Sequence, residues 1–226
     1  HTITLTCTDA GNAAVSDEFV LTVINTNDAP TITSTAVLTA TEDSLYTYTV
    51  TTADDDGETV TLTGTTVPSW MTFTASTGVL TGTPANAQVG THNVVITGSD
   101  GTATVTDTFT ITVANTNDAP TVASAISDVS TAEDASYSLD ASGTCTDVDG
   151  SDTMSYSISG APSTITATTA GVISGTPVNA NVGTHTITVT CADAAGATAT
   201  DQYVLTVTNT NDAPTVASAI SDVSTA

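Results

Sequence analysis

The sequence predicts an all-β protein made of tandem antiparallel β-sandwiches, each of about 90 residues. Three observations predict this fold class. The string Thr-Asn-Asp-Ala-Pro-Thr begins at Thr26, Thr116 and Thr210, at spacings of 90 and 94 residues. Between these copies, short segments alternate apolar residues with threonine, which is the period of a half-buried strand. No apolar stripe with helical spacing occurs anywhere in the 226 residues.

The alternating segments indicate where the strands of each repeat lie. The clearest are around residues 60–62, 109–113 and 187–189. Threonine makes up about a quarter of the chain, and a β-branched polar side chain suits the solvated face of a sheet. About seven short strands in 90 residues, separated by turn signals, indicate an immunoglobulin-like sandwich.

The repeated strings also divide the chain into segments. Residues 1–23 match 185–207, the last part of a repeat, and residues 215–226 match 121–132, the first part of one. We therefore expect the end of an upstream repeat at 1–27, complete repeats at 28–117 and 118–211, and the start of a downstream repeat at 212–226. This organisation is typical of one part of a longer tandem array, and a deletion product is the alternative.

The charge balance excludes several functions. The chain has 24 acidic residues and no lysine or arginine, for a formal charge of −24. It therefore cannot neutralise phosphates, which argues against nucleic acid as a partner, and it cannot dock on anionic lipid. Apolar residues make up 39% of the chain, enough for a core rather than disorder. No apolar run is long enough to span a bilayer, so no membrane insertion is expected of this segment.

The cysteines vary together between the repeats. Cys145 and Cys191 end an early and a late predicted strand of the second complete repeat, where the first has Thr52 and Gly98. Because both are present or both absent, a disulfide between them is predicted; three buried free thiols are the alternative. Cys7 occupies the position of Cys191, so its partner is expected upstream. A disulfide implies an oxidising compartment, hence an extracellular or cell-surface location.

No residue pattern indicates an enzyme. No nucleophile is accompanied by a base, and His1, His92 and His185 fall at equivalent strand positions, which favours packing or an edge contact. Trp70 could offer a carbohydrate platform, but the second repeat has Thr164 there, so core or turn packing is expected.

Four motifs, in order, resemble those of cadherin repeats. Residues 115–120 (Asn-Thr-Asn-Asp-Ala-Pro) resemble the calcium-binding cadherin linker, and Glu133, thirteen residues after the proline, resembles a ligand glutamate. Residues 147–149 (Asp-Val-Asp) are similar to the cadherin Asp-x-Asp motif, and Asp193 lies where cadherins carry another aspartate. The segment 68–84 is similar to the dystroglycan-type, or bacterial, cadherin-like branch.

The resemblance implies calcium sites at the joints between repeats. Calcium prefers six to eight oxygen ligands, more than one linker can offer. At the complete joint the implied ligands are Glu42, Asn115, Asn117, Asp118, Asp147, Asp149 and Asp193. At the preceding joint they are Asn25, Asn27, Asp28, Asp54, Asp56 and Asp100. The following joint has Glu133, Asn209, Asn211 and Asp212, and Asp9 would serve an earlier joint. Taken singly, each residue is as readily a turn former; their recurrence as a set favours coordination.

The sequence also departs from classical cadherins. The linker is one residue shorter and begins with asparagine, and the mid-domain acidic motif is replaced by Asn86 and Gln88, or by Asn179 and Asn181. Fewer charges imply weaker binding, so one or two ions per joint are expected.

The function expected from these features is structural. Calcium-stiffened repeats would form a stalk, fibre or filament, with neighbouring repeats and further copies of the chain as partners. An adhesin that presents a binding face to a cell or glycan is the alternative, and a carbohydrate-binding module of a secreted enzyme is a third interpretation.

Overall fold

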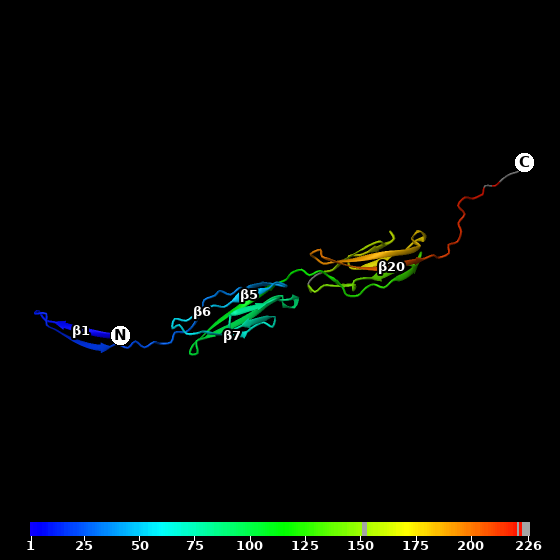
Figure 1. Cartoon of the computed structure of the whole chain (residues 1–226). Coiled ribbons are helices and arrows are strands. Elements are labelled where there is room, and N and C mark those ends of the chain that lie inside the picture. Colours follow the sequence, from blue (N-terminus) through cyan, green and yellow to red (C-terminus); the bar gives the residue numbers. More distant parts are fainter. Residues whose placement is uncertain (151–152, 221, 223–226) are drawn as a thin grey trace. The chain divides into compact units, whose positions relative to one another are not determined.

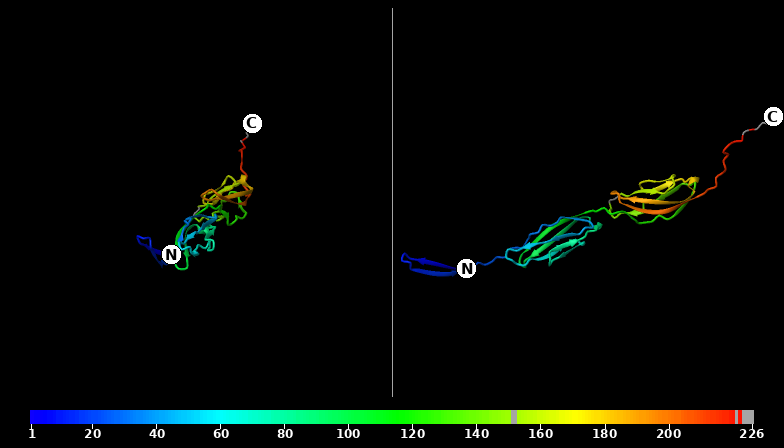
Figure 2. Two further views of the ribbon diagram at one scale, coloured as in Figure 1. Left: turned by 60° about the vertical axis from the view of Figure 1, so that its left-hand side comes forward. Right: turned by 45° about the horizontal axis from the view of Figure 1, so that its top comes forward.

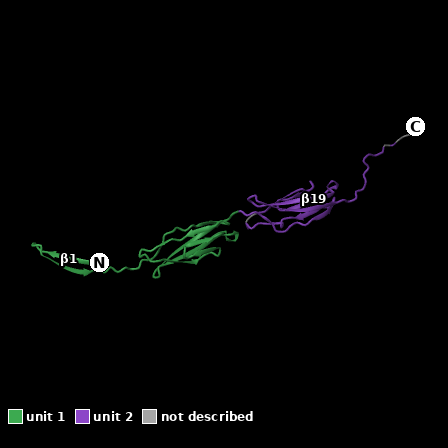
Figure 3. Ribbon diagram, viewed as in Figure 1, with its two compact units in different colours: residues 1–116 green, residues 117–226 purple. Residues whose placement is uncertain are grey.

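The computed structural model of the chain describes residues 1–150, 153–220 and 222 (Figure 1). The chain divides into two compact units, 1–116 and 117–226 (Figure 3). The predicted all-β fold is confirmed, since the helices in the described part are two 3-10 turns, η1 (Asn86–Gln88) and η2 (Asn179–Asn181). None of the described helices has the length and apolar character needed to cross a membrane. Residues 221 and 223–226 of the expected downstream segment lie outside the described residues.

The first unit begins with a hairpin of β1 (Thr2–Thr8) and β2 (Ala14–Val20), which pair antiparallel from Thr2↔Val20 to Thr8↔Ala14. Its apolar side chains are exposed, Leu5 by 62% and Phe19 by 52%. The matching residues in the second unit, Val189 and Tyr203, are buried in the core. The hairpin therefore has the strand pairing and the apolar face of a repeat's last two strands.

The sandwich of the first unit has two main sheets (Figures 1 and 2). The larger sheet has the order β4-β11-β10-β7, with β4 (Thr39–Thr41) parallel to β11 (Thr104–Ala114). Its other strands are β10 (Gly90–Ser99) and β7 (Thr61–Thr66), both paired antiparallel. The smaller sheet joins β5 (Tyr46–Thr49), β9 (Val79–Gly82) and β8 (Met71–Thr74), and β3 (Thr31–Ile32) pairs with β6 (Thr52–Ala53).

The core of this sandwich lies between the sheets and follows the strand period. In β11, Phe109, Ile111 and Val113 are buried while the residues between them are exposed. The ring of Phe109 meets Tyr48 of β5 edge-on at 5.7 Å, an arrangement that aromatic pairs prefer. Trp70 packs edge-on against Tyr46 and His92, consistent with a packing role.

The second unit repeats this architecture. Its larger sheet is β13-β20-β19-β16 and its smaller sheet β14-β18-β17, while β12 pairs with β15. The strands are β12 (Thr121–Val122), β13 (Val129–Ala132), β14 (Tyr137–Asp140), β15 (Cys145–Thr146), β16 (Ser155–Ser159), β17 (Ile165–Ala167), β18 (Val172–Gly175), β19 (Gly183–Ala192) and β20 (Thr198–Thr208). As in the first unit, the short N-terminal strand β13 runs parallel to the last strand, β20.

A disulfide joins Cys145 of β15 to Cys191 of β19, as predicted from their joint occurrence. Both cysteines lie in the buried cluster of this unit, so the bond connects a short strand to an inner strand of the larger sheet. Cys7 is a free, exposed cysteine of the β1–β2 hairpin.

The recurring histidines close turns. Nε2 of His92 donates to the Gln88 carbonyl at 2.7 Å, and Nε2 of His185 donates to the Asn181 carbonyl at 2.7 Å. In each repeat the imidazole therefore ties the start of a long strand to the 3-10 turn before it.

Candidate metal-binding clusters

Each repeat carries a buried glutamate that accepts a hydrogen bond from the chain just after the last strand of that repeat. This glutamate, the aspartate that follows it and the threonine that donates to it are called the glutamate cluster (Glu42, Asp43 and Thr116; Glu133, Asp134 and Thr210). Glu42 follows β4 and is 1% exposed. Its Oε2 accepts the Thr116 N–H at 3.2 Å, and its backbone carbonyl accepts the Thr116 hydroxyl at 3.3 Å. The other carboxylate oxygen, Oε1, is buried and has no hydrogen-bond partner.

The second repeat reproduces this arrangement. Glu133 is 2% exposed, and its Oε1 accepts the Thr210 N–H at 2.7 Å. Its Oε2 is buried without a hydrogen-bond partner. A buried polar atom without a hydrogen-bond partner calls for an explanation, and the binding of an ion is one of the standard explanations. The same unpartnered oxygen recurs in both repeats, so a chance rotamer is a poor explanation.

A second group, the linker cluster, lies at the other end of each repeat and contains linker residues and two acidic loops (Asn25, Asn27, Asp28, Asp54, Asp56 and Asp100; Asn117, Asp118, Asp147, Asp149 and Asp193). In the first unit, the Asp28 N–H donates to Asp56 Oδ2 at 2.6 Å, and Asn25 Nδ2 donates to Asp56 Oδ1 at 2.7 Å. Asn27 Nδ2 donates to Asp100 Oδ2 at 3.0 Å. The linker is thereby bound to loops about 30 and 70 residues later in the sequence.

The corresponding contacts of the second unit are nearly identical. The Asp118 N–H donates to Asp149 Oδ2 at 2.8 Å, and Asn117 Nδ2 donates to Asp193 Oδ2 at 2.9 Å. The Asp149 N–H donates to Asp147 Oδ1 at 2.9 Å, while Asp147 Oδ2 is buried without a partner.

The Asp-x-Asp loop of the first unit shows the same pattern. The Asp56 N–H donates to Asp54 Oδ1 at 2.9 Å, and Asp54 Oδ2 is buried without a partner. Sequence reasoning left out Glu58, yet one oxygen from each of Asp54, Asp56 and Glu58 lies within 4.8 Å of the others. The pKa of the exposed Glu58 is raised, first by partial desolvation and then by the charges of Asp100, Asp54 and Asp56.

Hydrogen bonds keep other carboxylates of the linker cluster ionised. The Asp28 N–H, followed by the Asn25 amide, lowers the pKa of Asp56. The pKa of Asp193 is lowered chiefly by the Asn117 amide. In Asp100 the largest cause of the lowered pKa is the Ala103 N–H, with the Asn27 amide next. These groups are anions over the physiological range.

The other predicted ligands have different surroundings. Asn115 Nδ2 donates to the neighbouring Thr116 carbonyl at 3.4 Å. Asp9 Oδ1 accepts the N–H groups of Gly11 and Ala13, and Asp193 Oδ1 accepts the Ala197 N–H at the equivalent position of the second repeat. Three more predicted ligands, Asn209, Asn211 and Asp212, are exposed.

The atoms that gather in both clusters fit a hard divalent cation. They are carboxylate, amide and backbone oxygens, with neither histidine nor cysteine, which suits calcium rather than zinc or copper. The chain has no lysine or arginine to neutralise them. The residues present therefore fit calcium.

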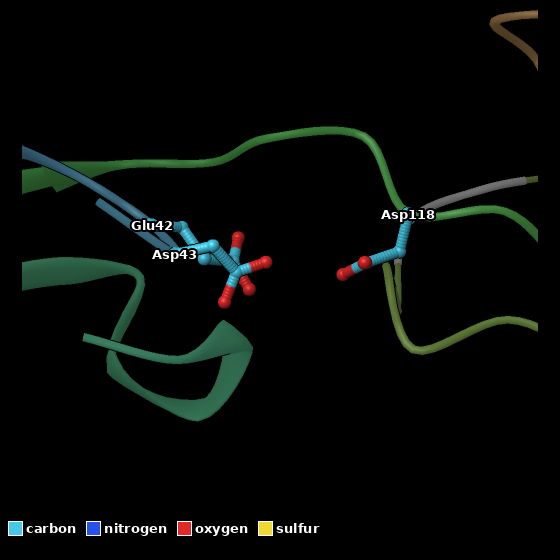
Figure 4. Close-up of side chains that lie close together, drawn as sticks. All are labelled: Glu42, Asp43 and Asp118. Carbon is cyan, nitrogen blue, oxygen red and sulfur yellow. The ribbon is translucent and has the colours of Figure 1, made fainter. Parts of the chain in front are cut away.

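The sequence-based ligand set omits Asp43 and Asp134, although Glu-Asp occurs in both repeats. Figure 4 shows the carboxylates of Glu42 and Asp43 side by side; Asp118, also labelled there, belongs to the second unit. The recurrence of the Glu-Asp dipeptide in both repeats is the sequence signal that could have identified these two aspartates.

Comparisons with known proteins agree with this architecture. The family described as "Putative Ig domain" matches residues 29–114 and 119–208. The "Serine-rich adhesin for platelets" of Staphylococcus aureus strain MRSA252 is 35% identical over 167 residues, 72% of this chain and 12% of that protein. The chain thus spans about an eighth of that relative's length.

Two solved structures share the fold. Protocadherin gamma B2 cadherin domains 1–5 align with 94% of this chain and 46% of that one, at a TM-score of 0.65 and 19% identity. Domains 1–2 of human mucin-like protocadherin align with 80% of this chain and 98% of that one, at a TM-score of 0.58 and 17% identity. The predicted cadherin-like sandwich is therefore confirmed at the level of the fold.

Proposed function

This chain belongs to the family described as "Putative Ig domain", and we propose that it is a calcium-binding segment of an extracellular surface protein. In this proposal calcium, held by the glutamate and linker clusters, stiffens the joints of a tandem array. The segment acts as a stalk or fibre that carries other parts of the protein away from the cell.

One observation carries the proposal. Glu42 and Glu133 are almost fully buried, and each has a carboxylate oxygen with no hydrogen-bond partner. An uncompensated buried carboxylate costs on the order of several kcal/mol. The chain has no lysine or arginine, so a metal cation that offsets this cost would come from solution.

The donor set supports calcium over magnesium. The carboxylates are anchored through one oxygen by backbone N–H groups, as with Glu42 by Thr116 and Asp147 by Asp149. This anchoring leaves single oxygens on separate loops, which suits the variable coordination of calcium better than the strict octahedron of magnesium.

The linker cluster explains how ion binding would stiffen a joint. Asn27 and Asp28, or Asn117 and Asp118, already donate to the acidic loops of the repeat that follows them. Repulsion among the loop carboxylates opposes these contacts. A bound divalent cation removes that repulsion, so the linker residues are held in one conformation.

Adhesion is the second candidate function, and the relative named as an adhesin favours it. A stalk requires only features that occur in every repeat, and both clusters recur in both complete repeats. We therefore infer that these repeats support an adhesive protein rather than form its binding face. Lateral association of copies into a fibre and the absence of enzymatic activity belong to the same proposal.

Small-angle scattering of the whole chain tests the calcium-dependent stiffening. We expect the maximum dimension to rise and the flexibility to fall when calcium replaces chelator, with magnesium giving a weaker response. Glu42→Gln should reduce the calcium response, while Asp107→Asn, an acidic residue of β11 outside both clusters, should leave it unchanged. Profiles that are the same in calcium and chelator would overturn the stiffening mechanism.

A binding assay separates the two candidate functions. If these repeats form the adhesive face, the labelled chain itself should bind platelets, the target in the relative's name. The stalk proposal expects no binding above that of an unrelated acidic β-protein.

A further inference from the structure

We propose that Asp43 and Asp134 are additional calcium ligands, so that each glutamate cluster binds its ion through a Glu-Asp pair rather than through one glutamate. This inference rests on the proposed calcium binding. It adds a ligand position to each repeat and assigns a role to the Gly-Thr-Pro segments of residues 82–84 and 175–177.

The first support is the proximity of two like charges. One carboxylate oxygen of Glu42 and one of Asp43 lie within 4.8 Å of each other (Figure 4). Glu42 is 1% exposed and its Oε1 has no hydrogen-bond partner, whereas Asp43 is exposed. Two carboxylates at this distance repel each other unless a cation lies between them. The close approach of the two carboxylates is therefore explained if both are ligands of one cation.

The second support is the backbone that presents the aspartate. Asp43 has φ +58° and Asp134 has φ +62°, the left-handed region that non-glycine residues rarely adopt. The Asp43 N–H donates to the Pro84 carbonyl at 2.9 Å, and the Asp134 N–H donates to the Pro177 carbonyl at 2.7 Å. The proline segment after β9 or β18 thus fixes the same unusual conformation in both repeats.

A turn role alone makes a different prediction. Aspartate tolerates positive φ, but glycine and asparagine tolerate it at least as well. If the aspartate served only the turn, glycine at this position would preserve all properties of the repeat. If its carboxylate is a ligand, glycine should preserve the fold and weaken calcium binding, so this substitution separates the two roles.

Amide NMR of the whole chain during a calcium titration provides the readout. The Thr116 N–H donates to Glu42 and the Thr210 N–H donates to Glu133, so each amide reports on one glutamate cluster. Asp43→Gly and Asp43→Asn should raise the calcium concentration at half-change of the Thr116 signal by about tenfold or more, the scale on which metal sites respond to loss of a supporting group. The Thr210 titration should stay unchanged, as should the Thr116 titration in the control Asp107→Asn, whose substitution lies in β11 outside both clusters.

The possible outcomes are distinct. If Thr116 titrates in Asp43→Gly as in the unmodified chain, Asp43 is only a turn residue and this inference is wrong, while calcium binding stands. If Thr116 does not respond to calcium even in the unmodified chain, the proposed function fails together with the inference. An equal loss at Thr116 and Thr210 would show a general loss of charge and would also overturn it.

Discussion

Asn117 and Asp193 are 76 residues apart in the sequence, yet Asn117 Nδ2 donates to Asp193 Oδ2 at 2.9 Å. Asn27 and Asp100 form the same contact at 3.0 Å in the first unit. In both units the linker asparagine is a donor to the acidic loop. It therefore orients a carboxylate as well as offering an amide oxygen, and orienting contacts of this kind tune metal ligands.

Replacing Asn117 should raise the pKa of Asp193. The Asn117 amide is the largest cause of that lowered pKa, and the loop N–H groups, Ala197 first among them, lower it further. In Asn117→Ala the pKa of Asp193 should move toward its ordinary value without reaching it. Carboxyl-detected NMR titration in chelator measures this, with Asn93→Ala as the control. An unmoved Asp193 pKa would show that the contact is not formed in solution.

Acidic pH should lower the stability of the first unit, because it protonates carboxylates of the linker cluster. The pKa values of Asp56 and Asp100 are lowered by hydrogen bonds. A lowered carboxyl pKa stabilises the fold fully above the ordinary value of 3.8, and this stabilisation is lost as pH falls through the lowered pKa. Urea unfolding in chelator, followed by the fluorescence of Trp70, the single tryptophan, should therefore show a midpoint that falls below about pH 4.

Two variants check the sign of this pH dependence. Asp100→Asn should make the urea midpoint fall less steeply at acidic pH (the acid limb), because it removes one carboxyl with a lowered pKa. Glu58→Gln should steepen the limb, since the raised pKa of Glu58 favours the fold on the acid side and partly masks the loss. The same acid limb in all three proteins would contradict the hydrogen-bonded cluster.

Sequence patterns were sufficient to predict the sandwich and to name most residues that gather in the linker cluster, but of each glutamate cluster they named the glutamate alone. Alternation marks strands such as β11 and β19, because every second residue is buried. Alternation cannot identify the two-residue strands β3, β6, β12 and β15, which are too short to show a period. The Cys145–Cys191 bond was predictable because the first repeat lacks both cysteines.

The remaining contacts depend on features that a sequence does not display. The role proposed for Asp43 rests on a positive φ and on a contact with Pro84, 41 positions away. Likewise, Asp201 Oδ2 accepts the Ile126 N–H at 2.6 Å across 75 residues. Such long-range hydrogen bonds depend on how the loops fold, which local residue patterns do not determine.

Loss of the disulfide should destabilise only the second unit. Cys145 and Cys191 close a loop with a sequence separation of 46, and removal of a disulfide of this kind costs about 2–4 kcal/mol. The double variant Cys145→Ala, Cys191→Ala should lower hydrogen-exchange protection in β19 and leave β10 unaffected. Equal loss in β10 and β19 would mean that the two units unfold together.

Gly175 should be intolerant of even one methyl group, for a purely steric reason. A Cβ at this position would lie closer than 3.0 Å to the Thr164 carbonyl oxygen and to Ile165 Cα, because Ile165 and Gly175 face each other in the β17–β18 pairing. A Cβ added at Gly143 would have no atom within 4 Å other than those of Gly143 and its chain neighbours. Gly175→Ala should therefore cost about 1–3 kcal/mol, as overpacking does, whereas Gly143→Ala should stay within about 0.5 kcal/mol.

Hydrogen exchange at Ile187, a fully buried residue of β19, measures both glycine variants against an amide of β10 as the internal reference. Because neither glycine has a positive φ, backbone strain does not contribute, and the difference between the two variants isolates the close approach of β17 and β18. If Gly175→Ala were as stable as Gly143→Ala, these strands would have to be further apart than the pairing of Ile165 with Gly175 allows.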